Sequence, residues 1–373
     1  MRVAAIYAGR WWGASASSHI ADDHLANFIR PNNVHVFVVT DPPSWCAASA
    51  ETRAAYRAGD IAAAQVEFVR QVTDAFRGWP KLHAALVPAE DREQPHEYGR
   101  ASMRAADAVL PVGQGRARAA IYMHRWYMQY EHVARAELFR RAFGPHDVIV
   151  RLRLDVKLNL PLTLTVSRDQ IVRAVVNATT QVIRFRRDTP EQGGGASADA
   201  VATPRPPLPQ PQLGSYGYWT VDAGAKSGVS TVPCVPRADE PLILAGQRRG
   251  HYNRVARCPE GRPLQWMWSD WLEVGTPRSF EVFASMTRLG TIYATHDSRV
   301  RCYGLCPEEQ NVFQLEARGV RMLPMNLPLT LHKITSAPCG TEPLLNMSEL
   351  GEQHRISPWY SLCLMRKSRP CSR

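Results

Sequence analysis

Short apolar runs alternate with amphipathic stretches through the first half of the chain. The apolar runs, each rich in Val, Ile, Leu or Ala, are 3–8, 34–40, 82–87 and 147–156. Between them, 61–76 is rich in good helix formers, and 119–143 carries apolar residues at three- and four-residue steps. Strands that alternate with helices predict βαβ units and a mostly parallel sheet. We therefore expect an α/β fold of the Rossmann-like kind, with helices flanking the sheet.

Capping and stop signals predict where several helices begin and end. Ser17 or Ser18 is a candidate N-cap for a helix that stops before Pro31, and Gly144-Pro145 ends the long helix. Downstream, Thr276-Pro277 has the chemistry of an N-cap followed by the first helical residue. A Trp-rich strand is expected within 264–274, a helix from Pro307 to Gly319 and a late strand at 320–323.

The periodic pattern stops near residue 188. Three consecutive glycines at 193–195 and a Pro-rich run at 204–211 favour a disordered or polyproline-like insertion. We divide the chain accordingly into an α/β part at 1–187, a basic Pro/Gly-rich insertion at 188–262, a continuation of the α/β part at 263–333, and an irregular tail at 334–373.

Composition is that of a globular protein with an anionic partner. Hydrophobic residues make up 45% and charged residues 21% of the 373 positions, while the formal net charge is +11. A basic excess favours phosphate, nucleotide, nucleic acid or an acidic surface. No run approaches the roughly 18 apolar residues of a membrane span, and the first run is too short for a signal peptide. We expect a cytoplasmic protein without a transmembrane segment, and a secretory lumen only if a targeting segment is missing. The eight scattered cysteines are expected to be buried or free thiols.

The segment 147–155 offers the most informative chemistry. Alternate side chains of a strand share a face, so Arg151, Arg153 and Asp155 should point one way. Ligands bind open α/β sheets outside the carboxyl ends of the strands, where this trio should emerge. Two guanidinium groups can grip a diphosphate, and a carboxylate can hold a divalent cation or a sugar hydroxyl. The alternative is a structural Arg–Asp network on a solvent-facing edge.

This segment resembles the "YD-x-V-I-R-x-R-x-D" motif of a group of GT-A-like glycosyltransferases that includes the WavE-type lipopolysaccharide synthesis proteins. Further similar stretches follow the family's order: a first strand ending in Gly and Arg at 2–10, a second strand at 34–41, "SDWLEVGT" at 269–276 and "PEEQ" at 307–310. The resemblance covers roughly two-thirds of the chain. The insertion has no counterpart in it.

The resemblance implies a GT-A-like enzyme that transfers a sugar from a nucleotide-diphospho-sugar donor to a glycan or lipid-linked acceptor. Asp155 would stand at the metal-binding position for Mn²⁺ or Mg²⁺, although only one carboxylate is present there. Arg151 and Arg153 would neutralise the donor phosphates, with Arg10 of the first loop as a further phosphate ligand. Asp41, at the end of the second strand, would contact base or ribose.

Three carboxylates are candidates for the catalytic base of an inverting transfer, namely Asp270, Glu308 and Glu309. Asp270 could equally be a strand residue paired with an arginine. Glu308 and Glu309 could equally be the acidic residues that stabilise a helix N-terminus.

Two other classes of function stay open. Arginines of the insertion favour a basic nucleic-acid-binding protein, but no nucleic-acid motif is present and the aromatic residues are not interleaved with them, so no specific nucleic acid is expected. A transferase fold retained as a structural module is the other alternative. The Trp11-Trp12 pair is expected to pack in the interior rather than to stack on a ligand.

Overall fold

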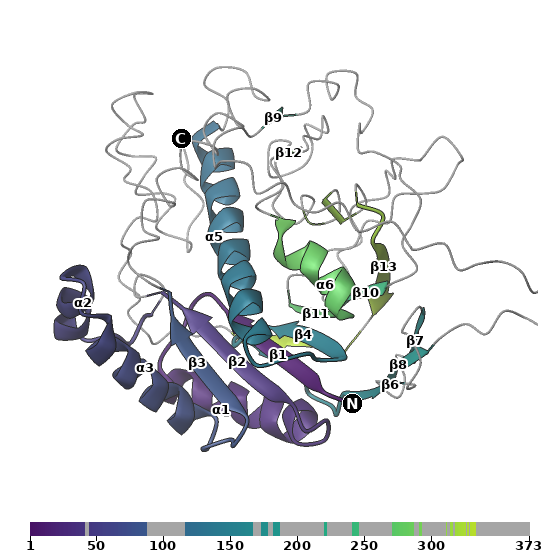
Figure 1. Cartoon of the computed structure of the whole chain (residues 1–373), viewed down its shortest axis with the longest axis horizontal. Helices are drawn as coiled ribbons and strands as arrows, with labels where there is room; N and C mark the ends of the chain where they lie inside the picture. The colour runs from purple at the N-terminus through teal and green to yellow at the C-terminus, as the bar shows by residue number, and fades with distance from the viewer. Residues whose placement is uncertain are drawn as a thin grey trace, which may run out of the picture.

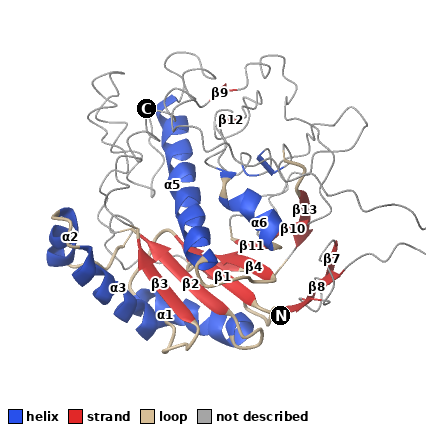
Figure 2. Cartoon of the chain, viewed as in Figure 1, coloured by secondary structure: helices blue, strands red, loops and turns tan. Residues whose placement is uncertain are grey.

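The centre of the molecule is a seven-stranded sheet with helices on both faces (Figures 1 and 2). The computed structural model describes residues 1–41, 45–87, 116–166, 173–177, 182–186, 220–221, 241–245, 271–286, 291–292, 311, 314–315, 318–325, 327 and 329–332. The strands, in their spatial order, are β13 (Arg321–Met325), β10 (Pro241–Ala245), β11 (Leu272–Gly275), β4 (Val148–Leu152), β1 (Val3–Ala8), β2 (His35–Thr40) and β3 (Leu82–Leu86).

The sheet is mixed but mostly parallel. Strands β3, β2, β1 and β4 pair in parallel, as do β10 and β13, while β11 runs antiparallel to both of its neighbours. The expectation of an α/β fold with a mostly parallel sheet is therefore confirmed.

Two helical layers cover the sheet. Helices α1 (Ala14–His24) and α3 (Ile61–Ala75), with the π-helical turn η1 (Leu25–Ile29), pack on one face. Helices α5 (Arg116–Arg141) and α6 (Pro277–Ala284) pack on the other, and α2 (Ala50–Arg57) lies against α3. Alternation along the strands fills both cores: Val150 faces the α1 and α3 layer, whereas Ile149 faces the α5 and α6 layer.

Short strands outside the main sheet form three small pairings. They are β5 (Val156–Lys157) with β14 (Thr330–Leu331), β9 (Thr220–Val221) with β12 (Thr291–Ile292), and a three-stranded sheet of β6 (Thr163–Val166), β8 (Val182–Arg186) and β7 (Arg173–Asn177).

Three local predictions need correction. Helix α1 begins at Ala14 after Gly13, so neither Ser17 nor Ser18 is its N-cap. Strand β4 ends at Leu152 and does not continue to 156. Strand β10 lies inside the range 188–262 that we assigned to the insertion; apart from it and β9, that range lies outside the described residues.

The start of α6 follows the sequence prediction. Thr276 is the N-cap, its hydroxyl accepts the Ser279 N–H, and Pro277 is the first helical residue. The Thr276 N–H in turn donates to the Ser279 hydroxyl oxygen, which completes a capping box.

Cys46 is the only cysteine within the described ranges, and it is disulfide-bonded. The expectation of buried or free thiols is therefore wrong at this position. Among the helices in the described part of the chain, none is both long and apolar enough to span a bilayer.

Candidate ligand site at the carboxyl edge of the sheet

The connections of the parallel strands reverse direction between β1 and β4. The chain passes from β1 to β2 and from β2 to β3 through α1 and α3 on one face, but from β3 to β4 through α5 on the other (Figure 2). Adjacent strands whose connections leave to opposite faces open a crevice at their carboxyl ends, where α/β proteins bind ligands. The residues that follow β1, β2 and β4 therefore define the candidate site.

The loop after β1 displays Arg10 on an anchored backbone. Gly9 has φ +108°, its N–H donates to Val39 O at 3.1 Å, and its carbonyl accepts the Thr40 hydroxyl at 2.6 Å. Arg10 is exposed, and its guanidinium lies 5.1 Å from the centre of the Trp12 ring. An aromatic face beside a guanidinium restrains the side chain without neutralising its charge.

Trp11 anchors this loop to the Cys46 segment and to α3. Its side chain is 1% exposed, and its backbone carbonyl accepts the Cys46 N–H at 2.7 Å. The indole N–H groups of Trp11 and Trp45 both donate to Gln71 Oε1, at 3.3 and 3.1 Å. Burial of Trp11 agrees with the expected packing role, while Trp12 remains partly exposed next to Arg10.

Asp41 follows β2 and meets a histidine of α5. His132 Nε2 lies 3.3 Å from Asp41 Oδ2, and both side chains are largely buried. Sequence reasoning did not single out His132. His132 does not fall on the apolar stripe of the long helix, and its partner lies about 90 residues away in the chain, so no local pattern pointed to it.

Arg153 and Asp155 follow β4 as an ion pair. Arg153 Nε and one terminal nitrogen donate to the two carboxylate oxygens of Asp155 at 2.8 and 2.7 Å, and the side chains are 29% and 19% exposed. In the β1–β4 register Arg151 is level with Ile6, so Arg153 is level with Ala8, near the start of the Arg10 loop. One strand, β1, separates β4 from β2 in the sheet.

Arg151 does not emerge at this edge. Its side chain is 2% exposed, and its guanidinium binds both oxygens of Glu273 on β11 at 2.9 and 3.0 Å. The guanidinium also lies 5.8 Å from the Tyr130 ring centre on α5. Because β4 ends at Leu152, only Arg153 and Asp155 of the expected trio leave the strand, and contact between Arg151 and a phosphate would require a buried ion pair to separate.

The carboxylate of Asp155, the predicted metal ligand, pairs with Arg153 in the structure. Both Asp155 oxygens bind Arg153, and the described side chains contain no group of three or more His, Cys, Asp or Glu arranged to hold a metal. A cation prefers several oxygen ligands that no guanidinium already occupies. The predicted base candidates Asp270, Glu308 and Glu309 lie outside the described residues.

No protein-family model matches this sequence, and no curated protein matches it significantly.

Proposed function

We propose that the chain is a glycosyltransferase of GT-A-like architecture that binds a nucleotide-diphospho-sugar at the carboxyl edge of β2, β1 and β4. The observation that carries the proposal is that Arg10, Asp41 and the Arg153–Asp155 pair follow the carboxyl ends of β1, β2 and β4, beside the reversal between β1 and β4. The motif resemblance supplies the reaction class, and the sheet topology supplies the expected ligand position.

In this proposal two guanidinium groups neutralise the donor diphosphate. Arg10 approaches from the loop after β1, and Arg153 from the end of β4. Asp155 holds the Arg153 guanidinium by both oxygens and so fixes its direction before the ligand arrives. Fixed donors of this kind stabilise the charge that develops on a departing nucleoside diphosphate.

In this proposal Asp41 contacts the base or ribose of the nucleoside. Its position after β2 is one strand away from the Arg10 loop, and His132 restricts its carboxylate. The acceptor side and the catalytic base belong to residues outside the described part of the chain, among which Asp270, Glu308 and Glu309 remain the candidates.

The first test of the reaction class is a thermal-shift panel of nucleoside diphosphates and nucleotide-sugars, each with manganese and with a chelator. A ligand present at about 100 times its dissociation constant stabilises the folded state by about 2.7 kcal/mol. We expect one nucleotide class to raise the melting temperature, and its sugar conjugate to release nucleoside diphosphate when acceptors are supplied. A protein that ignores every nucleotide but binds nucleic acid in a salt-sensitive way would contradict the proposal.

A further inference from the structure

Three histidines gather at the amino ends of β2 and β3, the edge opposite the candidate site. They are His35 on β2, His83 on β3 and His146 in the turn after α5, called here the amino-edge histidine cluster. The His35 ring centre lies 6.3 Å from that of His83 and 5.0 Å from that of His146. Phe143 completes the contact, with its ring centre 4.0 Å from that of His83. The cluster thus joins the end of α5 to the sheet.

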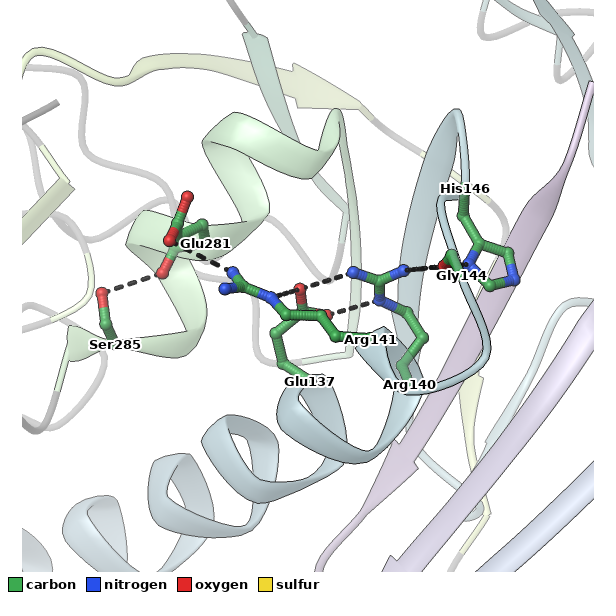
Figure 3. Close-up of polar contacts among 7 residues, drawn as sticks. All are labelled: Glu137, Arg140, Arg141, Gly144, His146, Glu281 and Ser285. Carbon is green, nitrogen blue, oxygen red and sulfur yellow. Dashed lines mark hydrogen bonds and ion pairs between the residues drawn. The ribbon is translucent and has the colours of Figure 1, made fainter. Parts of the chain in front are cut away.

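An ion network holds this end of α5, with Glu137 and Arg140 buried and Arg141 and Glu281 exposed (Figure 3). Arg140 donates to both oxygens of Glu137 at 2.7 and 2.8 Å, and Arg141 bridges Glu137 to Glu281 of α6. Arg140 also donates to His146 Nδ1 at 2.9 Å. A guanidinium is always a donor, so the contact with Arg140 makes Nδ1 of His146 an acceptor and puts the proton of the neutral ring on Nε2. The same Nδ1 lies 3.1 Å from Gly144 O, a carbonyl that can accept a proton from Nδ1 when the ring is charged.

The charges around the cluster oppose protonation of its rings. Arg140, Arg2 and Lys81 are the neighbouring cations; Arg2 donates to Phe143 O at 3.1 Å. The nearby carboxylates already have partners: Glu137 and Glu281 bind arginines, and Asp147 accepts the Arg2 backbone N–H at 2.6 Å. A proton on Nδ1 of His146 would face the Arg140 donor and break that hydrogen bond, and donation to Gly144 O offsets only part of this loss. Two further ring atoms, Nδ1 of His35 and Nε2 of His146, are buried and have no hydrogen-bond partner.

Burial, the largest cause, lowers the pKa of His146 to about 4, with Arg140, His35 and Arg2 adding to the effect. Burial likewise lowers the pKa of His35 and of His83. The folded cluster is therefore neutral at pH 7. Lowering the pH therefore reduces the free energy of unfolding, because the histidines of the unfolded chain bind protons at a higher pH than those of the folded cluster.

We propose that the amino-edge histidine cluster is an acid-sensitive latch, which fixes the C-terminal end of α5 on the β2–β3 edge while its rings are neutral and releases it when they are protonated. Release means local opening of 139–147, whereas the far face of the sheet stays folded. Local openings of this size are ordinary sub-global motions of a native protein. This inference does not depend on the proposed function.

The test is hydrogen exchange of the whole chain, followed by mass spectrometry at pH 7 and pH 4.5 and scaled to intrinsic exchange rates. In the wild type we expect peptides spanning 139–147 to lose protection at pH 4.5, with α1 and α3 remaining protected. His146→Gln should reduce that loss of protection. His83→Gln, at a partly buried position and therefore the milder change, should reduce it as well. Equal loss of protection over the whole sheet, or an unchanged loss in both variants, would overturn the latch.

His24→Gln is the matched control. His24 is also a buried histidine whose pKa burial lowers to about 4, but it lies on the α1 face. Its replacement should leave the acid opening of 139–147 intact. In denaturant titrations near pH 5, His146→Gln should reduce the proton uptake on unfolding by about one. No change in that uptake would also contradict the latch.

Discussion

At the scale of single residues, the Arg151–Glu273 pair shows that the same residue type is buried in the core at position 151 and lies at the carboxyl edge of the sheet at position 153. Both side chains are almost fully buried and bind each other across β4 and β11. Glu273→Gln removes the carboxylate charge that faces the buried Arg151 guanidinium, so it should lower the free energy of unfolding by roughly 3 to 5 kcal/mol. Urea denaturation measures this loss.

The double variant Arg151→Met with Glu273→Leu is the control for that prediction. It removes both charges together, and we expect it to recover most of the stability lost in Glu273→Gln. If the single variant is as stable as the wild type, the buried pair does not exist as described.

The sequence pattern identified 147–155 as a candidate ligand-binding segment. It could not show that Arg151 is buried in the core while Arg153 and Asp155 lie at the carboxyl edge. Alternation correctly placed Arg151 opposite Val150, but it could not say that the Arg151 face is buried. That fact depends on Glu273, which is 122 positions away in the chain. Arg153 and Asp155, two residues apart, form the local Arg–Asp pair that the structural alternative anticipated.

At the scale of elements, the loop between β1 and α1 depends on two glycines with positive φ. At Gly13, φ is +97° and an added Cβ would lie 2.5 Å from Ala47 Cβ. Gly13→Ala therefore adds backbone strain to a steric clash, and we expect a loss of about 2 to 4 kcal/mol in unfolding free energy. Thermal or urea denaturation measures it.

Two companion variants separate strain from clash. Ala47→Gly added to Gly13→Ala removes the clash and should restore part of the stability. Gly9→Ala, where φ is +108° and no atom lies within 4 Å of the added Cβ, should cost only the strain, about 1 to 2 kcal/mol. A Gly13→Ala protein that Ala47→Gly leaves unimproved would show that the two segments do not touch.

The strands and helices that a periodic pattern defines were predictable; those that depend on distant pairing were not. β1, β2, β3, α3 and α5 lie within a few residues of their expected bounds, because each has a clear apolar period. β10 is a five-residue apolar segment that follows Arg-Ala-Asp-Glu and precedes a Gly- and Arg-rich stretch, and only its pairing with β11 and β13 makes it a strand. The cap of α1 was misplaced because serine is the commoner N-cap, whereas Gly13 fits the tight approach to Ala47.

At the scale of the whole molecule, stability should fall on acidification because histidines are buried neutral on both faces of the sheet. His24 has no exposed surface; its Nε2–H donates to Val156 O at 2.6 Å and its Nδ1 accepts the Tyr7 hydroxyl at 3.1 Å. Burial also raises the pKa of Tyr7, so that hydroxyl stays a donor. This arrangement needs a neutral ring.

The sign follows from the lowered pKa of about 4 for His24 in the folded protein, against 6.5 for the unfolded chain. The stability is fully present above pH 6.5 and is lost as the pH falls to about 4. We expect His24 to account for a loss on the order of 3 kcal/mol over that window. Denaturant titrations at pH 7, 5.5 and 4.5 should show a shallower fall in His24→Gln; an identical fall would contradict the prediction.

The measurement that tests the central claim most directly is calorimetric binding of the best nucleoside diphosphate from the panel to Arg153→Gln, Arg10→Gln and Arg77→Gln. Arg77 lies in the turn between α3 and the amino end of β3, on the edge of the sheet opposite the candidate site. It forms an equally bidentate, exposed pair with Asp22 and serves as the charge-matched control. We predict at least a tenfold weaker affinity, about 1.4 kcal/mol, for Arg153→Gln and Arg10→Gln, and wild-type affinity for Arg77→Gln. Equal affinity in all three variants would place the diphosphate elsewhere and contradict the account.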